Sequence, residues 1–223
     1  VTLADSYVSV NEALKHATAS INSSVSIDWI DSETLNGNIK KLSEYQGILV
    51  PGGFGTRGSE GIIETASFAL EQNIPFLGIC FGFQLAAVSF GRSICKLEEA
   101  NSTEISADTA HPIIALLPEQ EGVSDMGGSL RLGANEIKIN PDTLASKLYN
   151  SNKISRRHRH RYEFNTNFRE QFKENGMIFS GESDNGKRME ILEVPSHKFF
   201  LGVQFHPEFN SRPGFPEESF KSF

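Results

Sequence analysis

The sequence has few cysteines and no long apolar run. Its two cysteines, Cys80 and Cys95, are too few for a disulfide scaffold or a cysteine-based zinc site, and we expect no metal. This scarcity is typical of a reducing compartment, so we expect a cytoplasmic protein. No apolar segment approaches the roughly 18 residues that a membrane span requires, and no signal peptide is visible. We therefore expect no membrane association.

Positive charge is also scarce. The 21 Lys and Arg residues against 28 Asp and Glu residues give a net charge of −7, which argues against nucleic-acid binding. The remaining composition, 38% hydrophobic and 22% charged residues, predicts one globular domain over residues 1–223. Because the chain begins with Val1, we expect it to be part of a longer protein or to be trimmed at its start.

Hydrophobic patterns predict an α/β fold. In the first hundred residues they predict helices over 6–19, 39–44, 62–72 and 82–90, and strands over 25–29, 47–50 and 75–79. This alternation indicates a mostly parallel, doubly wound sheet with helices on both faces. Later segments predict an antiparallel β elaboration: extended runs over 112–117, 130–139 and 156–164, strands over 177–181, 189–194 and 199–205, and a helix over 166–174.

The most informative stretch surrounds Cys80. Gly78, Cys80 and Gly82 form a Gly-x-Cys-x-Gly pattern between a predicted strand and a predicted helix, which is a nucleophile elbow with Cys in place of Ser. The helix N-terminus favours a thiolate, and the N–H of Phe81 is then free to face an oxyanion. Taken alone, the pattern fits a buried core cysteine equally well. Nothing around Cys95 resembles a site, so we interpret Cys95 as a core residue.

A second apolar strand stops on His206, Pro207 and Glu208. Glu208 could bond one ring nitrogen of His206 and leave the other for Cys80, which is the Cys–His–carboxylate arrangement of covalent catalysis. A lone histidine at a strand end is more often structural, but the nearby carboxylate and the elbow favour catalysis. The other candidate histidines are weaker, since two are expected to be exposed and one to precede a proline in a loop: His16, His197 and His111.

The loop over residues 51–58 follows a predicted buried strand, so it should lie at the same sheet edge as Cys80. Its glycines let backbone N–H groups approach a ligand, and Gly53 is the natural second oxyanion donor beside Phe81. The alternative, a phosphate-binding loop, fits neither G-x-G-x-x-G nor G-x-x-x-x-G-K-[ST].

These three motifs together resemble class I glutamine amidotransferases, over nearly the whole chain. Residues 100–104, 126–133 and 157–163 narrow the resemblance to the glutaminase domain of CTP synthases. The resemblance implies that Cys80 is the nucleophile, His206 the base and then acid, and Glu208 the orienting carboxylate. It also assigns residues that hold glutamine: Gly53, Phe81, Gln84, Glu104 and Arg161. The sequence departs from the family at Phe81 and Phe83, where Leu and Met are usual.

The same resemblance implies the wider reaction. Ammonia from L-glutamine would pass to an amidoligase domain of the same polypeptide, outside this chain, which aminates UTP to CTP with ATP and Mg. The full enzyme would be a homotetramer activated by GTP, and Arg57 in the glycine-rich loop would couple the effector to hydrolysis. No cofactor is expected in this domain. The family's sheet also has a strand before the first helix, and Val1 would follow it.

Other interpretations stay open. Another class I amidotransferase or a stand-alone γ-glutamyl hydrolase would keep the triad but not the sequence motifs over residues 100–104 and 157–163. A non-catalytic module would be expected to lose one of Cys80, His206 or Glu208. The basic run over residues 156–161 could be a solvated or nucleic-acid-binding patch. Its alternating Arg and His residues instead predict a strand with the two types on opposite faces, and Arg161 toward the site.

Overall fold

The computed structural model describes residues 4–35, 37–116 and 130–223. Its strands are β1 (Ile48–Val50), β2 (Phe76–Ile79), β3 (Ala100–Ser102), β4 (His111–Ala115), β5 (Arg131–Ile139), β6 (Lys153–His160), β7 (Glu163–Phe164), β8 (Ile178–Ser183), β9 (Arg188–Glu193) and β10 (Phe200–Val203). The α-helices are α1 (Val8–Ser20), α2 (Ser59–Glu71), α3 (Phe81–Ser93), α4 (Leu144–Tyr149), α5 (Arg169–Glu174) and α6 (Glu218–Ser222). The 3₁₀ helices are η1 (Ala4–Tyr7), η2 (Ser32–Leu35), η3 (Ile39–Glu44), η5 (Thr166–Phe168), η6 (Asp184–Gly186) and η7 (Pro207–Asn210).

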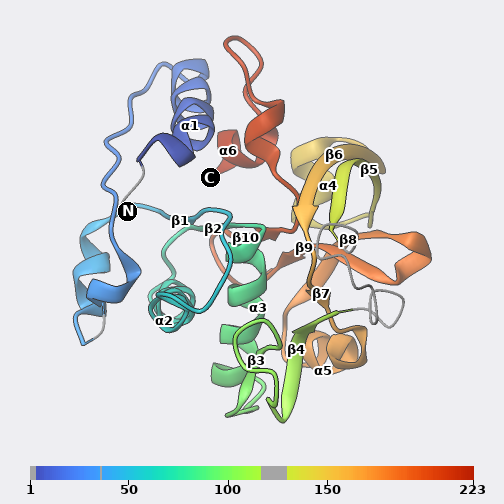
Figure 1. The fold of residues 1–223 in the computed structure, drawn as a ribbon. Helices are drawn as coiled ribbons and strands as arrows, with labels where there is room; N and C mark the ends of the chain where they lie inside the picture. Colours follow the sequence, from blue (N-terminus) through green and yellow to red (C-terminus); the bar gives the residue numbers. More distant parts are fainter. Residues whose placement is uncertain (1–3, 36, 117–129) are drawn as a thin grey trace.

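The main sheet is mixed and has the strand order β1-β2-β10-β9-β8-β5-β6 (Figure 1). Strands β1, β2 and β10 are parallel, and the pairs from β10 through β9, β8 and β5 to β6 are antiparallel. A smaller sheet contains β3, β4 and β7. The α/β class and the antiparallel elaboration are confirmed, and the parallel part consists of the three strands that carry the elbow and its neighbours.

Helices cover both faces of the parallel strands. One core cluster joins α2 and α3 to Phe76 of β2, and the other joins α1, α4 and α6 to Leu77 and Ile79. Successive side chains of β2 therefore enter opposite cores, as a strand with two covered faces requires. In Figure 1, α1 and α6 lie on one side of β1, β2 and β10, and α2 and α3 on the other.

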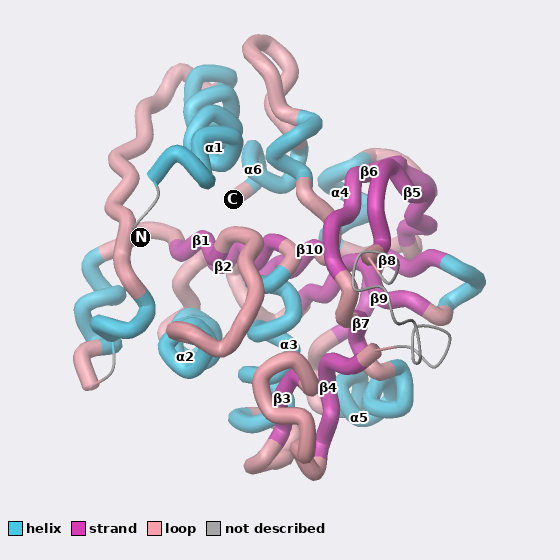
Figure 2. The backbone as a smooth tube through the Cα atoms, in the orientation of Figure 1, coloured by secondary structure: helices cyan, strands magenta, loops and turns pink. Residues whose placement is uncertain are grey.

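Several predicted elements differ from the structure. Residues 25–29 belong to no strand, and Figure 2 shows the stretch between α1 and η2 as loop. A strand needs a hydrogen-bonded neighbour, and no described segment pairs with these residues. Residues 39–44 form a 3₁₀ helix, and β3, α4 and α6 were not expected. The family motif over residues 126–133 lies partly outside the described residues. Leu117 and residues 1–3 lie wholly outside them.

Candidate active site

Cys80 stands in the turn between β2 and α3. Its backbone has φ 51° and ψ −97°, a strained conformation for a residue with a side chain, and its N–H donates to Val203 O of β10 at 2.7 Å. The helix packs tightly under the strand, because a Cβ at Gly82 would lie 2.4 Å from Val50 O. This is the strand–turn–helix geometry that the Gly-x-Cys-x-Gly pattern predicts. The first N–H groups of α3, Phe81 included, have no acceptor within the helix.

His206 and Glu208 meet beyond the end of β10. His206 Nδ1 and Glu208 Oε1 are 2.8 Å apart, and both side chains are largely buried. The sequence predicts this pair on one side of a strand end, but the strand stops at Val203 and Glu208 lies in the 3₁₀ turn that Pro207 begins. Proline has no N–H to offer a strand ladder, and its fixed φ suits the first turn of a helix. The contact is therefore present, although the backbone that makes it is a turn.

The second ring nitrogen of His206 is available for chemistry. His206 Nε2 is buried and has no partner within strict hydrogen-bond geometry among the described residues. Burial lowers the pKa of His206, but hydrogen bonding and charge from Cys80 and from Glu208 outweigh burial and raise it to about 10. The imidazolium is thus the favoured form when the thiolate is present, as in a Cys–His ion pair.

Gly52 holds the nucleophile and the base together. A Cβ at Gly52 would lie 2.7 Å from His206 Cε1 and 3.6 Å from Cys80 Cβ, so both residues approach the same point of the loop after β1. At Gly53 a Cβ would lie 3.4 Å from the Phe81 ring. The predicted oxyanion residues Gly53 and Phe81 are therefore neighbours.

The residues predicted to hold glutamine lie around Tyr162. Glu104 accepts from Gly55 N–H at 3.0 Å, which fastens it to the glycine-rich loop. Gln84 Nε2 donates to Tyr162 O at 3.0 Å. Burial raises the pKa of Tyr162, the charge of Glu104 raises it further, and the charge of Arg161 opposes them, so both charges act on this ring. Glu104 and Arg161 therefore both lie near the Tyr162 side chain.

Strand β6 separates its histidines from two of its arginines as predicted, whereas Arg156 is half-buried at the same alternation as the histidines. His158 and His160 are buried, and Arg157 and Arg159 are exposed. Burial lowers the pKa of His158 to about 2 and of His160 to about 3, and neighbouring positive charges add to both shifts, so these histidines are neutral. Arg161 itself lies in the turn just after the strand.

The other residues singled out from the sequence differ in burial and in partners. Cys95 is buried, and burial raises its pKa to about 11, as expected of a core thiol. Arg57 is exposed and pairs with Glu33 at 2.7 Å and with Asp31 at 3.7 Å, so it already has carboxylate partners. Two of the weaker histidines are half-buried rather than exposed, and the third begins strand β4 rather than lying in a loop: His16, His197 and His111.

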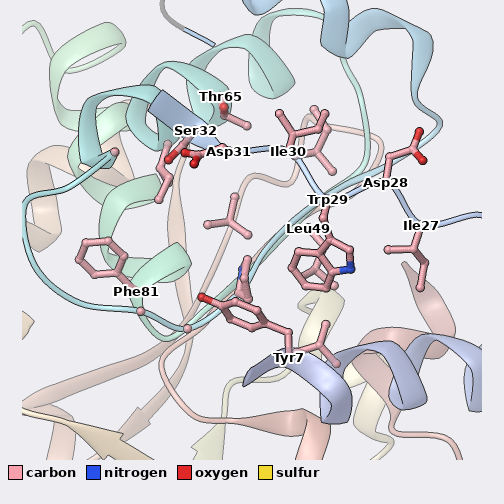
Figure 3. A pocket seen from close by; sticks show the side chains of 18 of the residues that line it. Tyr7, Ile27, Asp28, Trp29, Ile30, Asp31, Ser32, Leu49, Thr65 and Phe81 are labelled. Carbon is pink, nitrogen blue, oxygen red and sulfur yellow. The ribbon is translucent and has the colours of Figure 1, made fainter. Parts of the chain in front are cut away.

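A cavity of about 500 Å³ lies beside the catalytic residues but does not contain them. Figure 3 shows Tyr7, Ile27, Trp29 and Leu49 among the side chains that line it. Its lining reaches Gly53 and Phe81 at one end. The cavity therefore borders the proposed oxyanion loop.

Sequence reasoning missed some contacts of the thiol. Gln204 Nε2 lies 3.9 Å from Cys80 Sγ, and Sγ lies 3.8 Å from Arg159 O. A glutamine within the otherwise apolar run over residues 199–205 is a signal that could have found the first contact, because a buried amide requires partners. The backbone carbonyl leaves no such trace in the sequence.

The family model described as "Glutamine amidotransferase class-I" matches residues 2–223. The chain belongs to this family. Two curated relatives are named CTP synthase: one from Archaeoglobus fulgidus, 51% identical, and one from Staphylococcus epidermidis, 53% identical, each matched over 100% of this chain. The chain spans 42% of the length of both relatives.

A solved member of the family has the same fold. It is the glutaminase domain of Trypanosoma brucei CTPS with bound acivicin, 35% identical, with a TM-score of 0.93 over 99% of this chain and 87% of that one. The resemblance to the glutaminase domain of CTP synthases is thereby confirmed. Among the described residues, no cluster of His, Cys, Asp and Glu could hold a metal ion, and no helix is long and apolar enough to cross a membrane.

Proposed function

We propose that residues 1–223 form a single glutaminase domain that hydrolyses L-glutamine through a thioester on Cys80. The observation that carries the proposal is the strained elbow of Cys80 beside the hydrogen-bonded pair of His206 and Glu208, in a chain of the class-I amidotransferase family. The raised pKa of His206 supports a proton held on that ring while the thiolate attacks.

In the proposed reaction, His206 carries each proton that is transferred. The Cys80 thiol gives its proton to His206, and sulfur bonds to the side-chain amide carbon of glutamine. The tetrahedral oxyanion accepts hydrogen bonds from Phe81 N–H and Gly53 N–H. His206 returns the proton to the amide nitrogen, the C–N bond breaks, and ammonia leaves. Water then attacks the thioester, with His206 as base, and releases glutamate and the thiol. Glu208 orients the ring throughout.

Recognition of free glutamine fits the charges beside the elbow. Glutamine carries an α-ammonium and an α-carboxylate, which need an acidic and a basic partner. The charges of Glu104 and Arg161 both influence the pKa of Tyr162, which supports placing them near one another. We assign Glu104 to the ammonium and Arg161 to the carboxylate, and Gln84 to the support of Tyr162 and the substrate chain.

The ammonia would serve a longer protein. Relatives named CTP synthase are more than twice the length of the matched chain. An amidoligase domain of the same polypeptide would use it, with ATP and Mg, to aminate UTP to CTP in a cytoplasmic homotetramer. An effector such as GTP would be sensed through Arg57: an anionic effector would compete with the carboxylates of Glu33 and Asp31 for this arginine.

The test uses the intact protein and an electrophilic analogue of glutamine. We expect a stoichiometric adduct on Cys80 and none on Cys95, whose raised pKa keeps it a thiol. The Cys80→Ala variant should lose glutamine-dependent CTP formation and retain ammonia-dependent CTP formation. Labelling of Cys95 with Cys80 unmodified would overturn the proposed nucleophile. A Cys80→Ala protein that hydrolyses glutamine normally would overturn the reaction.

A further inference from the structure

Gln204 is a polar side chain in an apolar setting, with one end against the nucleophile. It follows β10 directly, is fully buried, and its backbone N–H donates to Glu190 O at 2.9 Å. Its side-chain Nε2 lies 3.9 Å from Cys80 Sγ, and its Oε1 lies 3.3 Å from Gln84 Nε2. A buried amide at this position therefore spans from the elbow helix to the thiol.

The neighbours fix which way this amide points. Gln84 Nε2 also donates to Tyr162 O at 3.0 Å, and a backbone carbonyl oxygen can only accept, so the NH₂ group of Gln84 must face this corner. The second proton of that NH₂ group then needs an acceptor, which Gln204 Oε1 supplies. Rotation of the Gln204 amide by 180° would set two NH₂ groups against each other and its carbonyl against sulfur. The donor end of Gln204 therefore faces Cys80.

This donor acts differently on the two forms of the sulfur. Arg159 O, at 3.8 Å, can accept the proton of a thiol, but its partial negative charge repels a thiolate. An amide N–H attracts the thiolate by donating a hydrogen bond, and it keeps its proton in doing so. Hydrogen bonds to a charged group are about twice as strong as those between neutral groups. The amide thus favours the ionised sulfur over the neutral one.

We propose that Gln204 is a positioning residue that stabilises the Cys80 thiolate through its side-chain N–H, held in orientation by Gln84 and Tyr162. It deepens the proposed function, since it supports the nucleophile of that site. It concerns the sulfur itself, so it can be tested without glutamine. Failure of the glutaminase proposal and failure of this one are therefore distinguishable.

The test is the pH dependence of Cys80 alkylation by iodoacetamide in the intact protein, followed by mass spectrometry of the Cys80 peptide. Gln204→Met keeps the length of the side chain and removes its donor. We expect the midpoint of the rate profile to move up by about one pH unit and the high-pH plateau to stay within about threefold of the wild type. Glutamine hydrolysis near neutral pH should fall about tenfold and recover in part at high pH.

Controls separate this role from simple packing. Gln171→Met makes the same substitution on α5, outside the site, and should leave the alkylation profile unchanged. A packing role for Gln204 would lower the rate at every pH without moving the midpoint, and that result would overturn the proposal. If Gln204→Met does not fold, Gln204→Asn keeps the amide one methylene short of sulfur. It should give the same upward shift, and an unshifted midpoint in that variant refutes the role equally.

Discussion

Adding one methyl group at Gly52 should impair the chemistry while leaving the fold intact. The backbone of Gly52 is outside the left-handed region, so alanine meets no conformational penalty there. Its Cβ would lie 2.7 Å from His206 Cε1, whereas carbon atoms rest about 3.5–4.0 Å apart, so the imidazole must move by about 1 Å. Glu208 holds the ring at Nδ1, and the added methyl would also lie 3.6 Å from Cys80 Cβ, so the movement carries Nε2 away from the thiol.

A misplacement of about 1 Å can cost roughly 10²-fold in rate, so kcat for glutamine hydrolysis in Gly52→Ala should fall about 30- to 100-fold. KM should change little, because the predicted glutamine-binding residues are not displaced. The matched control is Gly91→Ala in α3, where the added methyl meets its nearest neighbour at 3.4 Å. Steady-state assays and thermal unfolding of both variants decide the matter. A Gly52→Ala protein with wild-type kcat would refute the argument that this glycine sets the position of the base.

Two further predictions concern stability. The folded protein holds the proton of His206 up to a pKa of about 10 whereas the unfolded chain releases it near 6.5, so the stability that wild type gains over His206→Gln should be complete below pH 6.5 and disappear as the pH rises to about 10. Urea unfolding at pH 6 and pH 10.5 measures it, and a constant difference would contradict the assignment. Arg131 pairs with the fully buried Glu190 at 2.5 Å, so Arg131→Met should destabilise by about 3 kcal/mol by leaving that carboxylate with a hydrogen bond from Ser183 but without this cation. The double variant with Glu190→Gln should recover much of the loss, and a single-variant effect below about 1 kcal/mol would contradict the expectation.

The parts of the site that could be predicted are those in which local sequence dictates local backbone. Gly78, Cys80 and Gly82 specify their own turn, so the elbow was predictable from five consecutive residues. His206 and Glu208 were predictable as a pair because they are two residues apart, although Pro207 makes the connection a 3₁₀ turn.

The rest depends on pairing between distant segments. Residues 25–29 have a strand composition but no hydrogen-bonded neighbour, and composition cannot reveal a missing partner. Helices α4 and α6 have six and five residues, too short for a helical period to register. The contact of Gln204 with Cys80 spans 124 residues of sequence, and only the register of β10 against β2 creates it.

The register of β10 against β2 also determines when, during synthesis from the N-terminus to the C-terminus, the site can assemble. The thiol meets its base only when β10 docks beside β2, with Phe200 opposite Phe76, and this pairing closes a loop of more than a hundred residues. Such distant pairings are slow to form compared with helices and hairpins, which fold from neighbouring residues. A nascent chain on the ribosome therefore contains Cys80 long before His206 has been synthesised. During that interval the thiol has no histidine base, so we expect the nascent chain not to hydrolyse glutamine.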